Sequence, residues 1–190
     1  MLEILRPGVQ TSVQDRGRHG LRHLGIARSG ALDMPALYRA NCLVGNSPEA
    51  AGLEIVLGPV SLRLGRDAWL ALSGSDFHPA LDGQPIGTGW RTPAKAGQIL
   101  TMSGCEYGMR TYLAIDGGLA VPEALGACAT DLQAGFGGFL HQAFALAFIG
   151  NHDQLHFAID MAFAIPIAAG CADLHFGRQY QFFCHLILDG

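Results

Sequence analysis

Glycine ends one extended segment after another in the first two thirds of this sequence. The segments "VSLRLG", "AWLALSG", "QILTMSG" and "MRTYLAIDGG" are rich in apolar residues and each closes on glycine. In the first of them Val60, Leu62 and Leu64 share one face and Ser61 and Arg63 the other, which is the period of a β-strand. The chain holds 26 glycines among 190 residues, about twice the usual share. Short strands joined by tight turns therefore predict a barrel or a sandwich rather than a helical bundle.

One helix and one hairpin turn stand out from this pattern. Asp33 is a suitable N-cap, Pro35 fits the first turn, and "ALYRANCLV" runs on to a stop at Gly45-Asn46. The dipeptide Asp82-Gly83 is a strong signal for a two-residue β-hairpin turn. The sequence thus predicts a mostly β fold with one helix in its N-terminal half.

Charge and hydropathy exclude several classes of protein. The net charge is −4 and the pI is about 6.0, so the basic surface of a nucleic-acid-binding protein is missing. The most apolar window, 157–172, contains Asp160 and Pro166 and is shorter than the roughly 20 residues of a membrane span. The start, "MLEILRPG", lacks the order of a secretory leader. The five cysteines are odd in number and form no C-x-x-C pair, so we expect reduced thiols in a cytoplasmic protein.

Opposite charges lie close together in "TSVQDRGRHG" at positions 11–20. Gln14, Asp15, Arg16 and Arg18 place an amide, a carboxylate and two guanidinium groups on a stretch too rich in glycine to be a helix. Arginine binds carboxylate or phosphate through a bidentate fork, and an adjacent aspartate can orient it or act as a base. The structural alternative is a solvated turn with a local ion pair, which contributes little to stability.

A second polar stretch, "ARSGALDMPALYRANCLVGN", covers 27–46. Asp33 is most simply the helix cap, and Asn41 and Asn46 lie on the helix and just past its end. Buried amides of this kind either fix a loop or hold a polar ligand, and the sequence leaves both roles open.

The composition changes near position 139. The segment 139–190 holds eight of the ten phenylalanines and five of the eight histidines, and it has no Lys and no Glu. His152 and His156 have helical spacing, but the glutamate of an H-E-x-x-H site and a clear third ligand are missing, so no metal site is expected.

Five motifs carry a resemblance to a known family. In order and at matching spacing, "TSVQDRGRHG", "ARSGALDMPALYRANCLVGN", "GLEIVLGP", "RTYLAIDGG" and "LGACATDLQAGFGG" resemble the biotin-dependent carboxyltransferase family, also called allophanate hydrolase subunit 2. The resemblance covers roughly 1–138 and implies a cyclophilin-like β-barrel. Past "GFGG" the family continues into a second half that completes the barrel, whereas this sequence reads "FLHQAFALAFIGNHDQLHF". We therefore expect 1–138 to be the N-terminal part of the family domain and 139–190 to be a tail without family match, from truncation or a frame shift. The barrel would then be incomplete and the chain alone inactive.

The resemblance also implies a site, because the charged loop belongs to the functional cleft of the family. We predict Asp15, Arg18 and Asp33 as catalytic residues, with an arginine balancing phosphate charge and an aspartate acting as base or orienting water. The predicted substrate-binding residues are Gln14, Asn41, Asn46, Arg110 and Tyr112.

The implied function is that of one subunit in an ATP-dependent 5-oxoprolinase, which opens 5-oxoproline to glutamate. Its implied partners are a homologous subunit 1 and a lactam-hydrolase-like subunit, with ATP used in the complex. The alternatives are a carboxyltransferase subunit that moves a carboxyl group from carboxybiotin to urea, and a non-catalytic regulator that binds a kinase inhibitor. The chain has no Met-Lys-Met sequence and no G-x-x-x-x-G-K-[ST] pattern, so biotin would be carried by another chain.

Overall fold

The computed structural model describes residues 2–105, 107–138 and 145–146. These residues belong to one compact unit. The predictions made for His152, His156 and the apolar window 157–172 lie outside the described residues.

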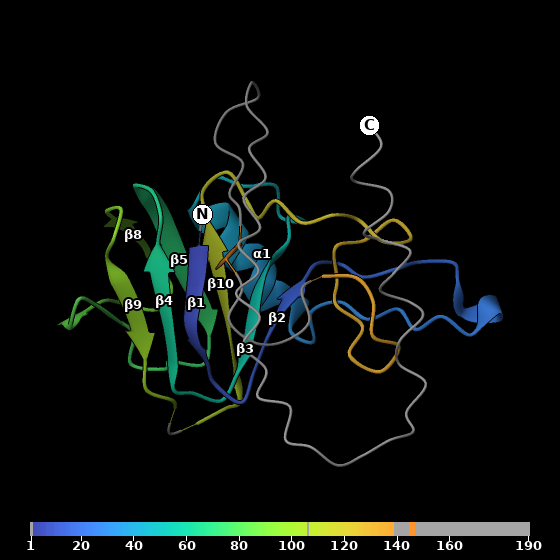
Figure 1. Ribbon diagram of the computed structural model, residues 1–190, viewed down its shortest axis with the longest axis horizontal. Helices are drawn as coiled ribbons and strands as arrows, with labels where there is room; N and C mark the ends of the chain where they lie inside the picture. Colours follow the sequence, from blue (N-terminus) through green and yellow to red (C-terminus); the bar gives the residue numbers. More distant parts are fainter. Residues whose placement is uncertain (1, 106, 139–144, 147–190) are drawn as a thin grey trace, which may run out of the picture. The chain divides into compact units, whose positions relative to one another are not determined.

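The described chain forms two antiparallel sheets, drawn in Figure 1. Sheet A has the order β11-β1-β4-β9-β6-β7, and sheet B has the order β2-β3-β10-β5-β8. The strands of sheet A are β1 (Leu2–Pro7), β4 (Val60–Leu64), β6 (Ala80–Leu81), β7 (Gln84–Pro85), β9 (Ile99–Met102) and β11 (Ala145–Leu146). Those of sheet B are β2 (Gln10–Gln14), β3 (Gly52–Val56), β5 (Ala68–Gly74), β8 (Arg91–Ala94) and β10 (Arg110–Ile115). Within the described residues neither sheet closes on itself, so the mostly β, incomplete-barrel prediction is confirmed.

The main core is built from apolar side chains of both sheets. Leu62 of β4 and Leu100 of β9 belong to the same buried cluster as Leu53 of β3, Leu70 of β5 and Leu113 of β10. The strand β4 shows the predicted alternation, with Val60, Leu62 and Leu64 buried. Burial of alternate side chains thus explains why these short segments are extended.

The predicted helix is present as α1 (Met34–Leu43). Asp33 caps it, because its Oδ1 accepts a hydrogen bond of 3.1 Å from the backbone N–H of Ala36. Leu37 is fully buried and packs with Tyr112 in a second, smaller core cluster. The helix contacts β10 and β5, so it covers the face of sheet B that points away from the main core (Figure 1).

The hairpin prediction is also confirmed. Asp82 and Gly83 connect β6 to β7 with φ angles of 47° and 80°. Two positive φ angles in a row define the turn that matches the twist of a hairpin.

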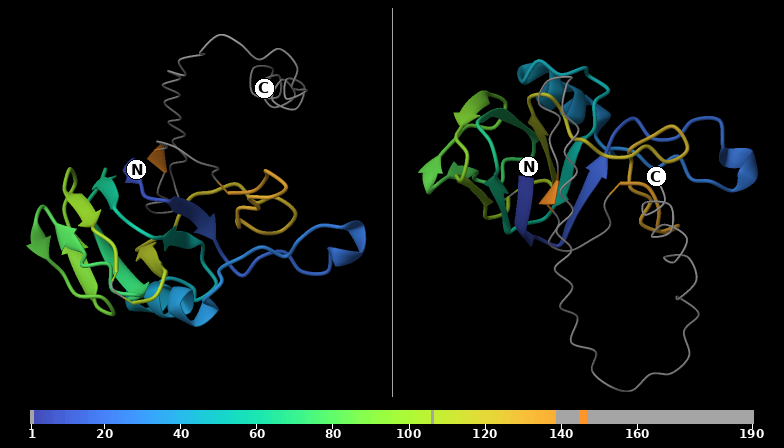
Figure 2. Two further views of the ribbon diagram at one scale, coloured as in Figure 1. Left: turned by 90° about the horizontal axis from the view of Figure 1, so that it is seen from below. Right: turned by 45° about the horizontal axis from the view of Figure 1, so that its top comes forward.

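A long arm separates β2 from α1. It carries the short 3-10 helix η1 (Arg22–Leu24) near its end and projects away from both sheets in the two views of Figure 2. Its base is fixed by backbone bonds from Arg18 N–H to Arg28 O (2.7 Å) and from Ala31 N–H to Asp15 O (2.9 Å). The charged loop predicted from the sequence is therefore the root of this arm. No helix in the described part of the chain has the length and apolar character required to cross a membrane.

Candidate functional site

A row of buried polar side chains crosses sheet B on the face that α1 covers. Ser12 on β2 pairs with Glu54 on β3, Glu54 pairs with Tyr112 on β10, and Tyr112 pairs with Ser73 on β5. All four residues are buried. Because residues opposite each other in neighbouring strands point to the same face, the register alone brings these polar groups into one line.

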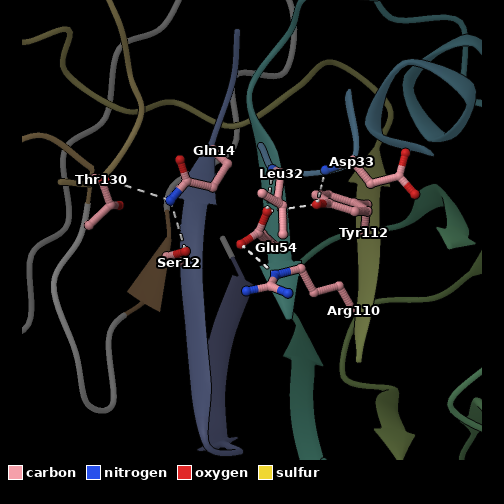
Figure 3. A network of polar contacts seen from close by, with 8 residues as sticks. All are labelled: Ser12, Gln14, Leu32, Asp33, Glu54, Arg110, Tyr112 and Thr130. Atoms are coloured by element: carbon pink, nitrogen blue, oxygen red, sulfur yellow. Dashed lines mark hydrogen bonds and ion pairs between the residues drawn. The ribbon is translucent and has the colours of Figure 1, made fainter. Parts of the chain in front are cut away.

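Glu54 is the centre of this row, as Figure 3 shows. Its Oε2 accepts hydrogen bonds from the Tyr112 hydroxyl (2.7 Å) and from the Leu32 backbone N–H (3.0 Å). Its Oε1 forms a longer ion pair of 3.4 Å with Nε of Arg110. A buried carboxylate is stable in such a place because several donors replace its lost hydration.

Tyr112 links the strand to the start of α1. Its hydroxyl accepts a 2.8 Å hydrogen bond from the Asp33 backbone N–H while it donates to Glu54. Burial, reinforced by the bond to Glu54, raises the pKa of the Tyr112 phenol above its ordinary value. The phenol therefore stays protonated at physiological pH and acts as a fixed link between Asp33 and Glu54.

An open cavity of about 430 Å³ lies beside this network. It is lined by Leu32, Asp33, Ala36, Arg39, Gly74, Ser75, Met109 and Arg110. Two guanidinium groups, one carboxylate and one hydroxyl thus share a concave surface, which fits a small polar ligand that carries negative charge. We call this cavity the helix-side cavity.

The structure brings three predicted residues together here. Asp33 and Arg110 line the helix-side cavity, and Tyr112 lies beneath it. The Asp33 side chain has two roles, since Oδ1 caps α1 and the residue also faces the cavity. The prediction that these residues act on a substrate stays a prediction.

The other charged residues of the sequence motif lie elsewhere. Gln14, Asp15 and Arg18 are buried, so the alternative of a solvated turn does not describe these side chains. Arg16 is exposed and forms a 3.0 Å ion pair with Glu49. The motif therefore divides between an outward arginine and three side chains packed into the molecule.

Asp15 joins two distant segments of the chain. Its Oδ1 accepts a 2.7 Å bond from the Gly17 N–H, and its Oδ2 accepts a 2.6 Å bond from the Cys128 N–H. It also lines a separate cavity of about 360 Å³ together with Glu49 and Glu123. The carboxylate thus holds the arm root against the 124–130 segment.

Gln14 and Arg18 bind the same segment. Gln14 Nε2 donates to Ser12 Oγ (3.0 Å) and to the Thr130 carbonyl (3.3 Å). Arg18 donates to the carbonyls of Ala124 (2.9 Å) and Ala129 (2.7 Å). Both side chains therefore position backbone in the described structure, and their predicted roles toward a substrate remain predictions.

Asn41 and Asn46 hold the end of α1. Asn41 Nδ2 donates to the carbonyl of Ala50 (2.7 Å), and Asn46 Nδ2 donates to the carbonyl of Ile115 (2.8 Å). Asn46 also donates to Asn41 Oδ1 (3.2 Å). Of the two roles that the sequence left open, these contacts show the loop-fixing one.

Metal and thiol chemistry find little support in the described residues. They contain no group of three or more His, Cys, Asp or Glu side chains arranged to hold a metal ion. Burial, together with the nearby carboxylates of Asp15 and Glu123, raises the pKa of the Cys128 thiol to about 11. A thiol with this pKa is a poor nucleophile at neutral pH, as expected for a packing residue.

Known proteins share both the sequence and the fold of this chain. The family model described as "Carboxyltransferase domain, subdomain A and B" matches residues 24–170. The chain belongs to this family. The carboxyltransferase chain is 52% identical over 138 residues to the 5-oxoprolinase C subunit of Escherichia coli, and 39% identical over 138 residues to that of Haemophilus influenzae. Each match covers 73% of this chain.

A solved relative shares the fold of the carboxyltransferase chain. The crystal structure of the K. lactis urea amidolyase superposes with a TM-score of 0.74 at 34% identity, covering 77% of this chain and 9% of that protein. The chain spans 44% of the length of the E. coli relative and 45% of that from H. influenzae. The predicted division at residue 138 stays a prediction, and the family match continues past it to residue 170.

Sequence reasoning missed two residues of the carboxyltransferase site. Glu54 lies within the motif "GLEIVLGP" and is the one acidic residue in an apolar strand. An isolated charge within a buried strand is a signal that would have found it. Arg39 gave no such signal, because nothing in the sequence says which side of α1 faces the cavity.

Proposed function

We propose that this chain is part of the C subunit of an ATP-dependent 5-oxoprolinase. The observation that carries the proposal is its 52% identity over 138 residues to the corresponding E. coli protein. The reaction would open the lactam of 5-oxoproline to glutamate, with ATP and water consumed and ADP and phosphate released. ATP is a co-substrate of the assembled complex in this proposal.

The helix-side cavity supplies groups suited to this chemistry. A lactam resists hydrolysis, and transfer of a phosphoryl group to its oxygen makes the ring carbon electrophilic. Arg39 and Arg110 line the cavity and would balance negative charge on the substrate carboxylate or on the phosphoryl group. Asp33 lines the same cavity and would accept a proton from the attacking water.

Glu54 and Tyr112 would act as positioning residues. Glu54 holds the Nε side of Arg110, so the remaining guanidinium nitrogens are directed by a buried anchor. Tyr112 fixes the backbone of Asp33 at the start of α1. Such buried support limits the motion of groups that contact a substrate.

Carboxyl transfer to urea is the second candidate. The likeness to K. lactis urea amidolyase at 34% identity favours it. This reaction would require biotin on another chain, because this sequence has no Met-Lys-Met attachment site. A cavity that bears two arginines would accommodate a carboxylated group, so the fold alone does not separate the two reactions.

The test uses the chain with its assembly partners, which we propose to be a homologous subunit 1 and a lactam-hydrolase-like subunit. The partners would be co-expressed with this chain, and ATP hydrolysis would be measured with 5-oxoproline, with urea and with no substrate. We expect 5-oxoproline to stimulate hydrolysis, and stimulation by urea alone would contradict the proposal. A complex with a complete family member in place of this chain is the positive control.

A matched pair of variants tests the cavity itself. Arg39 is exposed and lines the cavity, whereas Arg6 is exposed on β1 away from it. We expect Arg39→Gln to reduce 5-oxoproline-dependent turnover by about tenfold or more, the effect of one charge-assisted hydrogen bond, and Arg6→Gln to leave it unchanged. Equal turnover of the two variants would remove the helix-side cavity from the proposal.

A further inference from the structure

The arm between β2 and α1 carries a concentration of positive charge. A cavity of about 340 Å³ on it is lined by Arg18, His19, Gly20, Arg22, His23 and Arg28. No carboxylate is among these described lining residues, although the chain as a whole has a net charge of −4. We call this cavity the arm cavity. It shares no lining residue with the helix-side cavity.

Arg18 carries a buried charge that forms no ion pair within the described residues. It is 2% exposed, and its partners are the carbonyls of Ala124 and Ala129 and the ring of Phe136, whose centroid lies 4.5 Å from the guanidinium carbon. Its Nη1 is buried and has no hydrogen-bond partner in the described part of the chain. Burial of a charge without a counter-charge is unfavourable, so a bound anion at this cavity would stabilise the arm.

The other cationic side chains are available to a ligand. Arg28 donates to the Arg16 carbonyl through Nε (3.3 Å) and Nη2 (3.2 Å), which orients its guanidinium group. Arg22 is exposed, and no side-chain contact to it is found within the described ranges. The two histidines add hydrogen-bond donors and carry further charge when protonated.

The geometry points to the arm cavity as a binding site for a multivalent oxyanion of the phosphate class. Three arginines supply three permanent charges, more than a single carboxylate neutralises, whereas a diphosphate or triphosphate group matches them. Arginine forks suit phosphate oxygens geometrically. The base of the arm is fixed by backbone bonds on both sides, so these groups are held close together before a ligand arrives. This inference is independent of the proposed function, because the two cavities have no residue in common.

The test measures binding directly, without turnover. Pyrophosphate would be titrated into the full chain and followed by calorimetry and by the rise in melting temperature. Arg22→Gln is expected to weaken pyrophosphate binding by about tenfold. Arg22→Lys keeps the charge but loses the fork, so its affinity should fall between those of Arg22→Gln and the unchanged chain. Arg6→Gln removes an exposed arginine outside the arm and should bind as the unchanged chain does.

Competing ligands distinguish the sources of the phosphate. Similar affinities for pyrophosphate and ATP, with no binding of adenosine, would show that the phosphate chain is recognised and would support the inference. A tighter complex with ATP would support it and add the nucleoside to the ligand. Three outcomes would overturn it: no saturable binding of pyrophosphate, unchanged binding by Arg22→Gln, or competition by succinate as strong as that by pyrophosphate.

Discussion

The phenol of Tyr112 donates a 2.7 Å hydrogen bond to the carboxylate of Glu54 on the neighbouring strand. Both side chains are buried beneath the start of α1. The same phenol accepts the backbone N–H of Asp33, so one hydroxyl group connects two strands with the helix cap. The stability of the sheet and the placement of the helix-side cavity therefore depend on the same contact.

Tyr112→Phe tests this contact. The variant keeps the ring and leaves the Asp33 N–H without its acceptor and Glu54 without one of its donors. We expect the free energy of unfolding to fall by about 1–3 kcal/mol, the cost of buried polar groups without partners. Urea denaturation measures it, and Tyr107→Phe, at an exposed tyrosine, is the control. Equal stability of the two variants would show that the contact contributes nothing.

Asp33 offers a separation of its two roles. Asparagine is as good an N-cap as aspartate, whereas alanine costs about 1 kcal/mol of helix stability. We expect Asp33→Asn to keep the melting temperature and to lose about 100-fold of the activity of the assembled complex, as for loss of a general base. Asp33→Ala should lose both. Full activity in Asp33→Asn would restrict Asp33 to capping.

Gly17 and Gly20 form a matched pair on the arm. Their φ angles are 77° and 78°, but a Cβ on Gly17 would lie 2.5 Å from the Arg28 carbonyl oxygen, whereas Gly20 has open space. Gly20→Ala should cost about 1 kcal/mol for the left-handed backbone alone. Gly17→Ala should cost about 1–3 kcal/mol more, because the two sides of the arm must separate. The two melting curves give the difference, and coincident curves would contradict the close approach.

Asp15→Asn tests how the arm root is attached. Both carboxylate oxygens accept backbone N–H groups, and an asparagine NH₂ would face one of those donors. We expect a loss of about 1–3 kcal/mol in the free energy of unfolding. Glu123→Gln, at an exposed carboxylate nearby, is the control and should change stability little. A stable Asp15→Asn protein would leave the carboxylate free for the catalytic role predicted from the sequence.

Cys128 gives a prediction on pH. Its thiol pKa is raised from 9.0 to about 11, so the native state holds this proton more tightly than the unfolded chain does. This contribution to stability is complete below about pH 9 and is lost as the pH rises toward about 11. At pH 8 iodoacetamide should modify the exposed Cys42 well before Cys128, as peptide mass spectrometry would show. Faster modification of Cys128 would contradict the assigned burial.

The sequence by itself determined the local elements of this protein. The alternation of Val60, Leu62 and Leu64, the capping Asp33 and the turn Asp82-Gly83 are each encoded within a few residues, and each appears where it was predicted. Local patterns are sufficient because they depend on backbone preference and on contacts between near neighbours. The family motifs likewise identified the carboxyltransferase domain.

Tertiary structure alone decided which residues meet. Asp15 and Arg18 are close in sequence, yet Asp15 binds the Cys128 N–H and Arg18 the Ala129 carbonyl, so both are fixed by a segment more than a hundred residues away. Glu54 and Tyr112 are 58 positions apart and become neighbours only through the register of β3 and β10. Strand register depends on the pairing of whole sheets and on burial of one face, and no short stretch of sequence contains that information.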